Sequence, residues 1–141
     1  MNEPITRTTQ LAPDLPLTIT EMGSGRTALI LHGGGGPFTV QSIAAHLSTT
    51  MRVLMPTHPG WNGTERPAWF ASVNHLAVAY LRLLKAEGEH DVIVIGSSLG
   101  GWIASEMASR DGGDLITGLV LIDATGVEIA GSPITDFYTL D

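Results

Sequence analysis

The amino-acid sequence predicts an α/β fold built on a mostly parallel, doubly wound sheet. Short apolar runs alternate along the chain with segments whose apolar residues recur at helical spacing. This alternation favours right-handed strand–helix–strand crossovers and a parallel sheet with helices on both faces. Glycine-rich stretches follow the ends of the apolar runs, and in such sheets the functional groups gather at those strand ends.

The first elements are a strand pair, a buried strand and a helix. Residues 5–10 and 17–21 are β-prone and are separated by the turn-forming letters APDLP. Residues 27–33, TALILHG, form a continuous apolar run, which is typical of a strand buried on both faces. Residues 37–50 predict a helix, with Pro37 in its first turn.

The same alternation continues to the end of the apolar pattern. We expect strands at residues 52–57, 91–96 and 116–126 and helices over residues 69–88 and 99–110. Gly88 ends the first of these helices. The letters after residue 126 show no clear period.

Length and composition restrict the function classes. A chain of 141 residues suffices for one core. The net charge of −7, with seven Lys and Arg and no basic run, argues against nucleic acid as a partner. The absence of cysteine excludes disulfides and thiolate metal sites. We find no signal peptide and no run near the roughly 20 apolar residues of a membrane span, so we expect a cytoplasmic protein without membrane contact.

The letters GSSLG, residues 96–100, form a G-x-S-x-G pattern between a predicted strand and a predicted helix. A tight turn there forces Ser98 into a strained conformation and needs glycines, because side chains would collide with neighbouring backbone. The turn presents the Ser98 hydroxyl at a helix N-terminus, which favours developing negative charge. The alternatives are a chance match in a glycine-rich chain and a serine that only caps the helix. We predict that Ser98 is a catalytic nucleophile.

His32 and the four glycines that follow it form a second functional segment. Glycines leave backbone N–H groups uncovered, as an oxyanion hole requires, and the predicted donors are the N–H groups of Gly34 and Leu99. A phosphate-binding loop would need the letters GK[ST], which are absent. A dinucleotide-type match at residues 23–28 precedes a strand rather than a helix. We reject both alternatives, and the chemistry expected at Ser98 implies neither a cofactor nor a metal.

Three segments resemble motifs of the α/β-hydrolase fold in the order of that family. LILHGGGG resembles its oxyanion segment, PTHPGWNGTERP its P-G-x-G-x-S/T-x-x-P loop, and VIGSSLGGWIA its nucleophile elbow. The resemblance implies that the chain is the N-terminal half of a serine hydrolase, in which Ser98 attacks an ester-like or related carbonyl of a small-molecule substrate. It further implies that residues 1–126 are part of the core and that residues 127–141 begin a cap insertion or form an irregular tail.

The sequence departs from the family pattern in its histidines, all five of which precede Ser98. The family's histidine and usual acid would lie beyond Asp141, so we expect a sheet incomplete at its C-terminal side and a truncated, inactive or impaired chain. His58 stands where the family's loop often carries an aspartate, and we interpret it as a polar loop residue near the mouth of the cleft rather than a base. Asp123 is a candidate acid, and its alternative role is structural, within the following turn.

Two further expectations concern apolar surface. Residues 119–122 would form an exposed apolar strand edge, through which the chain self-associates or aggregates unless its missing half accompanies it. The aromatic residues Trp61, Trp69 and Phe70 either line an apolar substrate cleft or pack as core or lid. The rival to a hydrolase is a non-catalytic binding or assembly module of the same fold, and the fold alone does not name a substrate.

Overall fold

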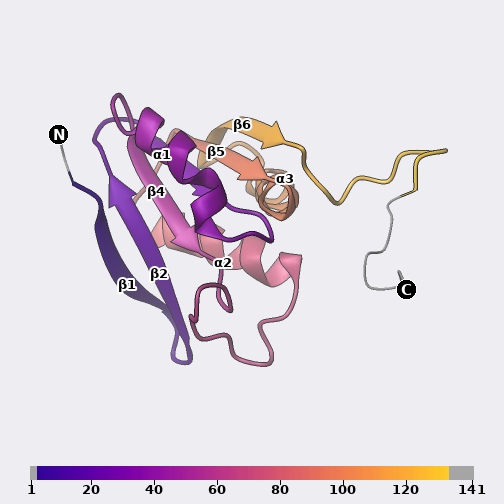
Figure 1. Cartoon of the computed structure of the whole chain (residues 1–141), viewed down its shortest axis with the longest axis horizontal. Helices are drawn as coiled ribbons and strands as arrows, with labels where there is room; N and C mark the ends of the chain where they lie inside the picture. The colour runs from indigo at the N-terminus through magenta and orange to yellow at the C-terminus, as the bar shows by residue number, and fades with distance from the viewer. Residues whose placement is uncertain (1–2, 134–141) are drawn as a thin grey trace.

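A computed structural model describes residues 3–133, which form one six-stranded sheet with helices on both faces (Figure 1). The strands are β1 (Ile5–Ala12), β2 (Leu15–Met22), β3 (Thr27–Leu31), β4 (Arg52–Thr57), β5 (Val92–Ser97) and β6 (Ile116–Ile122). The helices are the short 3-10 helix η1 (Pro37–Val40), α1 (Gln41–Leu47), α2 (Val73–Ala86) and α3 (Leu99–Asp111). This architecture confirms the predicted α/β class.

The strand order is β1-β2-β4-β3-β5-β6. The four strands from β3 to β6 run parallel, whereas β1 and β2 form a hairpin whose second strand pairs antiparallel with β4. All five residues of β3 are buried, as expected for a central strand covered on both faces. The chain crosses from one parallel strand to the next through helices, which confirms the doubly wound arrangement.

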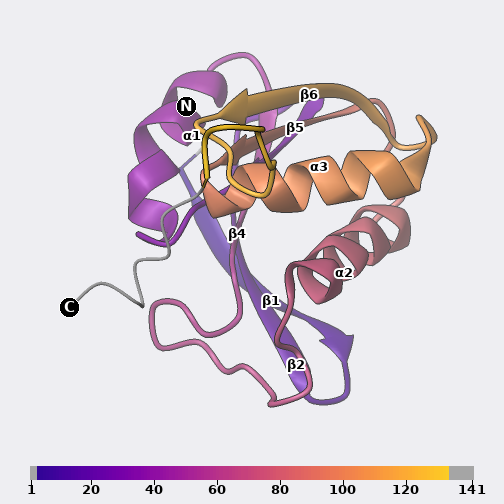
Figure 2. The same cartoon turned by 90° about the vertical axis from the view of Figure 1, so that its right-hand side faces the viewer.

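Two apolar cores lie on the two faces of the sheet. Because successive side chains of a strand point to opposite faces, β3 contributes Leu29 and Leu31 to one core and Ile30 to the other. The larger core includes buried residues of α2 and α3, and the smaller includes Val40 and Ala44 around the start of α1. Figure 2 shows α1 on one side of the sheet and α2 with α3 on the other.

Several predicted element boundaries are wrong, each for a local reason. Helix α2 begins at Val73 rather than residue 69, because the Ser72 side chain caps it by accepting a hydrogen bond from the His75 N–H. The segment predicted as one helix over residues 37–50 is η1 followed by α1, which ends at Leu47. Strand β6 ends at Ile122, because Asp123 takes a left-handed conformation with φ 45°.

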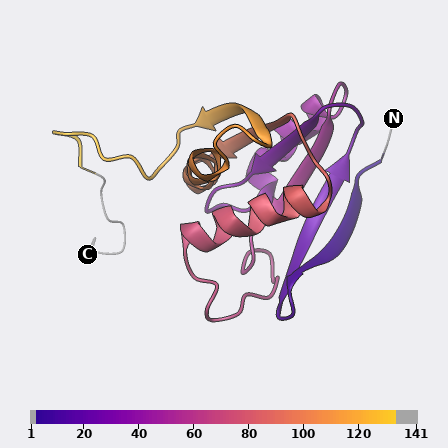
Figure 3. The same cartoon turned by 180° about the vertical axis from the view of Figure 1, so that it is seen from behind.

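Strand β6 is an edge strand, with β5 as its one neighbour in the described sheet. Leu119, Val120 and Leu121 are each 40 to 46% exposed, which confirms the predicted apolar edge. Beyond β6, residues 123–133 leave the sheet without forming a helix and hold one isolated bridge, between Ile129 and Ser132 (Figure 3). The predicted start of a cap at residues 127–141 stays a prediction, and residues 134–141 lie outside the described chain.

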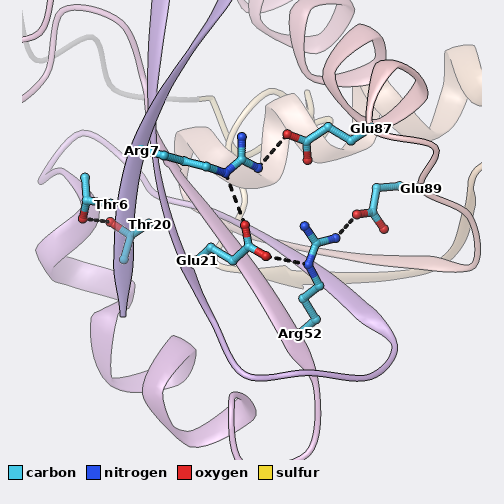
Figure 4. Close-up of polar contacts among 7 residues, drawn as sticks. All are labelled: Thr6, Arg7, Thr20, Glu21, Arg52, Glu87 and Glu89. Atoms are coloured by element: carbon cyan, nitrogen blue, oxygen red, sulfur yellow. Dashed lines mark hydrogen bonds and ion pairs between the residues drawn. The ribbon is translucent and has the colours of Figure 1, made fainter. Parts of the chain in front are cut away.

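An ion-pair network joins the elements at the amino ends of the parallel strands (Figure 4). Arg7 of β1 contacts Glu21 of β2 at 3.2 Å and Glu87, after α2, at 2.6 Å. Arg52 of β4 contacts Glu21 at 2.8 Å and also pairs with Glu89. The hydrogen bond from Arg52 to Glu21 lowers the pKa of that carboxyl against the opposing effect of partial burial. The network thus ties the hairpin to β4 and to the end of α2.

Within residues 3–133, no helix is both long and apolar enough to cross a bilayer.

Candidate active site

Ser98 lies in the tight turn between β5 and α3, with φ 53° and ψ −117°. A non-glycine residue in this region of backbone space is strained and needs support from its surroundings. Its N–H donates to the Ile122 carbonyl at 2.9 Å, and its carbonyl accepts from Gly101 N–H at 2.9 Å and Thr125 N–H at 3.2 Å. The Ser98 side chain makes no capping hydrogen bond to α3, so the capping alternative does not explain this residue.

Close packing around the turn explains its two glycines. A Cβ atom on Gly96 would lie 2.2 Å from the Gly100 carbonyl oxygen, and one on Gly100 would lie 2.1 Å from the Leu31 carbonyl oxygen. Both obstacles are backbone atoms, which cannot move aside without displacing β3 or α3. The G-x-S-x-G spacing is therefore a steric requirement of this turn.

The glycine segment after β3 runs beside Ser98. A Cβ atom on Gly33 would lie 2.9 Å from Ser98 Cβ, so any side chain larger than that of glycine would crowd Ser98 at this position. Gly34 is exposed, and a Cβ atom there would meet no atom within 4 Å. Among the described residues, no hydrogen bond engages the N–H of Gly34 or of Leu99. The two predicted oxyanion donors thus directly follow Gly33 and Ser98, which are in contact, and their N–H groups have no hydrogen-bond partner among the described residues.

Two histidines, His32 and His58, are in contact beside the glycine segment, and both are fully buried. The His32 and His58 ring centroids are 3.7 Å apart. The backbone N–H of His58 donates to His32 Nε2 at 2.9 Å, so His32 carries its proton on Nδ1, which donates to the Gly33 carbonyl at 2.7 Å. His58 Nε2–H donates to the His32 carbonyl at 2.6 Å, and His58 Nδ1 accepts from the Tyr80 hydroxyl at 2.5 Å.

The burial of His58 corrects the expectation of a polar residue at the mouth of the cleft. Burial lowers its pKa to about 3, with a smaller contribution from the adjacent His32. Burial also lowers the pKa of His32. Because each ring is neutral and both nitrogens of each are hydrogen-bonded, neither histidine has a free lone pair for the Ser98 proton.

None of the other candidate acids and bases makes a hydrogen bond with the Ser98 side chain within residues 3–133, although Asp123 lies between Ile122 and Thr125, which both hydrogen-bond the Ser98 backbone. His46 is exposed on α1, His75 is half-buried at the start of α2, and His90 is exposed before the amino end of β5. Asp123 is exposed, and its carboxylate has no hydrogen-bond partner within residues 3–133. Its predicted role as an acid remains a prediction. Those residues also hold no group of three or more His, Asp or Glu side chains suited to a metal ion.

A cavity of about 430 Å³ opens next to the turn and reaches Leu99, the residue after Ser98. Its lining consists of Pro59, Trp61, Arg66, Phe70, Ala71, Ser72, Val73, Leu76 and Leu99. Two of the three aromatic residues predicted for an apolar cleft therefore line it. Trp69 does not: it lies on the surface toward the β1–β2 hairpin, where its indole N–H donates to Asp14 at 2.7 Å.

Comparisons with known proteins agree with this geometry. A model of the alpha/beta hydrolase family matches residues 28–139. Uncharacterized proteins of Mycobacterium tuberculosis and Mycobacterium bovis are 31% identical over 106 residues, which cover 74% of this chain and 31% of each relative. The chain thus spans about a third of the length of these relatives.

Solved structures give the same result. A putative lipase from Acinetobacter baumannii AYE is 28% identical with a TM-score of 0.81, over 93% of this chain and 45% of the lipase. A membrane phospholipase A is 26% identical with a TM-score of 0.82, over 92% and 42% of the two chains. An epoxide hydrolase, 23% identical with a TM-score of 0.82 over 94% and 47%, shares the fold. The chain, which spans about half of these structures, belongs to the alpha/beta hydrolase family.

Proposed function

We propose that the chain carries the nucleophile and oxyanion hole of a serine hydrolase, with Ser98 attacking an ester-like carbonyl of a small molecule. The observation that carries this proposal is the strained Ser98, whose hydroxyl does not cap the helix and which lies against Gly33. The N–H groups of Gly34 and Leu99 hold the negative charge that develops on the carbonyl oxygen.

In this reaction a base removes the Ser98 proton as Oγ bonds to the carbonyl carbon, and the former carbonyl oxygen becomes an oxyanion. The oxyanion then collapses and expels the leaving group, which takes the proton from the base, and water hydrolyses the acyl-serine. His32 and His58 cannot be this base, since their nitrogens are all hydrogen-bonded. We propose that a segment outside the described residues supplies it, so the 141-residue chain alone is inactive or impaired.

The cavity beside Leu99 supports an apolar group on the substrate. Its lining includes Trp61, Phe70 and Leu76, which favour a hydrocarbon or aromatic portion. The lipase and the phospholipase A among the similar structures support an ester-like bond as the target.

Labelling with a fluorophosphonate, followed by intact mass measurement, tests the nucleophile. We expect one adduct on the wild-type chain, none on Ser98→Ala, and an unchanged adduct on the control Ser97→Ala. We expect slow labelling, because within residues 3–133 no base is hydrogen-bonded to the Ser98 hydroxyl. Equal labelling of the wild type and Ser98→Ala would contradict the proposal. The rival is a non-catalytic binding or assembly module of this fold. It predicts no labelling of Ser98 even in a longer protein that includes the segment proposed to supply the base.

We also propose that the chain self-associates through β6, because its exposed apolar side chains lie on an open strand edge. Sedimentation velocity checks this, with Val120→Lys expected to lower the average mass. The matched control is Thr8→Lys on β1, an exposed position at the other edge of the sheet. A wild-type chain that sediments as a monomer would contradict self-association without affecting the proposal for Ser98.

A further inference from the structure

We infer that Tyr80 and His58 are positioning residues, which hold the Gly33–Gly34 peptide so that the Gly34 N–H faces the oxyanion. This inference rests on the proposed function of Ser98. Neither side chain can touch a substrate, since both are fully buried. They act through a chain of hydrogen bonds that runs from α2 to the glycine segment.

The hydrogen bonds at the Gly33 carbonyl, the last in this series, fix the orientation of the proposed donor, the Gly34 N–H. The Gly33 carbonyl and the Gly34 N–H belong to one trans peptide, so they point in opposite directions. That carbonyl accepts from His32 Nδ1–H at 2.7 Å and from Gly36 N–H at 3.2 Å. Holding the carbonyl on the buried side therefore turns the Gly34 N–H outward.

The middle link fixes the His32 ring. Its Nε2 accepts from the backbone N–H of His58, so its proton must be on Nδ1, where it reaches the Gly33 carbonyl. The other tautomer would place two donors or two acceptors face to face in a buried site, and a flipped ring would lose both hydrogen bonds by exchanging its nitrogens for C–H groups. The adjacent ring of His58, tilted by 34° with its centroid 3.7 Å away, further restricts the rotation of the His32 ring.

The first link fixes the His58 ring. Its Nε2–H donates to the His32 carbonyl, which leaves Nδ1 as an acceptor for the Tyr80 hydroxyl. Burial raises the pKa of Tyr80 well above its usual value, so the hydroxyl keeps the proton that it donates. Without that hydroxyl, His58 Nδ1 would be a buried acceptor without a partner. This costs free energy, so the ring would be expected to rotate toward another donor.

The segment that carries His58 also holds the glycine segment through a second side chain, Trp61. Trp61 Nε1–H donates to the Gly34 carbonyl at 2.9 Å. The consecutive carbonyls of His32, Gly33 and Gly34 thus all accept hydrogen bonds from a side chain. This arrangement leaves the intervening N–H groups facing away from the loop, as donors to an oxyanion must.

The decisive experiment is nitrogen-15 NMR of the histidine rings and glycine amides in the full chain. In the wild type we expect His32 with its proton on Nδ1 and His58 with its proton on Nε2. In Tyr80→Phe we expect the His58 ring signals and the Gly34 amide signal to move, and the rate of fluorophosphonate labelling at Ser98 to fall by about tenfold. The matched control is Thr27→Val, which removes another buried hydroxyl at the far end of the sheet.

The outcomes separate positioning from general stability and from catalysis. Either a His32 ring protonated on Nε2 in the wild type or the same change of the Gly34 signal in Tyr80→Phe and Thr27→Val would overturn the inference. The NMR signals do not depend on the reactivity of Ser98. If they behave as expected while Ser98 is not labelled even with its base restored, the proposed function fails and the positioning role stands.

Discussion

The two ends of the sheet are held together by opposite means. At the carboxyl ends of the strands, His32, His58 and Tyr80 are neutral, fully buried and matched donor to acceptor. At the amino ends, a network centred on Arg52 and Glu21 uses full charges on side chains that are 27% exposed (Figure 4). The stability of the end that carries Ser98 therefore depends on the geometry of buried hydrogen bonds, whereas the stability of the opposite end depends on attraction between charges.

This difference follows from the environment of each set of groups. In a buried site a hydrogen bond is strong when satisfied and costly when its partner is lost, so small displacements matter. Ion pairs near the surface tolerate displacement, but water and salt weaken them. Substitutions that change side-chain volume, and low pH, should therefore destabilise the carboxyl end. Added salt should instead destabilise the amino end.

The largest loss in the free energy of unfolding is expected from Gly100→Ala. The added Cβ would lie 2.1 Å from the Leu31 carbonyl oxygen, so α3 must shift away from β3. We expect the free energy of unfolding to fall by roughly 3 kcal/mol, the upper part of the range for overpacking, despite the better helix propensity of alanine. Urea unfolding measures this. The control is Gly34→Ala, where a methyl group meets open space, and an equal loss in both variants would show that packing is not the cause.

The second effect is a loss of stability in mild acid. The pKa of His58 is about 3 and that of His32 is lowered, both by burial, so the unfolded chain takes up protons first as the pH falls below about 6.5. Stability from these rings is complete above about pH 6.5 and is lost as the pH falls below it, by up to about 1.4 kcal/mol per pH unit for each neutral histidine, and for His58 the loss continues to about pH 3. The lowered pKa of Glu21 adds its own loss only below about pH 4.5. Urea unfolding between pH 6.5 and 4.5 isolates the histidines, and a constant stability there would contradict their neutral state.

The smallest effect is expected from Glu21→Gln at the amino end. It removes the charge that joins Arg7 and Arg52, and we expect a loss of about 1 kcal/mol at low salt that shrinks in 1 M NaCl. The comparison variant is Glu106→Gln, which breaks an exposed pair with Arg110 and should cost about 0.3–0.5 kcal/mol or less. A loss for Glu21→Gln that does not depend on salt would mean that the network acts by packing rather than by charge.

Most of the fold could be predicted because its signals are local and repeated. The buried run of β3, the helical stripes of α2 and α3 and the apolar edge of β6 each follow from residue spacing. Element ends were less accessible to prediction. The start of α2 depends on the Ser72 cap, and the end of β6 depends on the left-handed conformation of Asp123.

The candidate site was predictable where sterics decide it and not where folding brings distant residues together. The glycines around Ser98 carry their own signal, because few other residues fit the turn. The partnership of His32, His58 and Tyr80 joins residues 22 and 26 positions apart, and no local pattern indicates it. A histidine in place of the family's aspartate was the available clue, and its burial could not be inferred from a loop of glycine and proline.

The hydrogen bonds of Ser98 to Ile122 and Thr125 have a kinetic consequence for the nucleophile. The strained turn depends in part on β6, the strand with a single neighbour in the described sheet, and edge strands open more readily than central ones. Each opening of β6 releases the strain at Ser98, which amounts to about 1–3 kcal/mol for a residue in such a conformation. The fraction of time that Ser98 spends in the strained conformation therefore depends on the balance between opening and closing of β6, and a partner strand paired with that edge would raise this fraction.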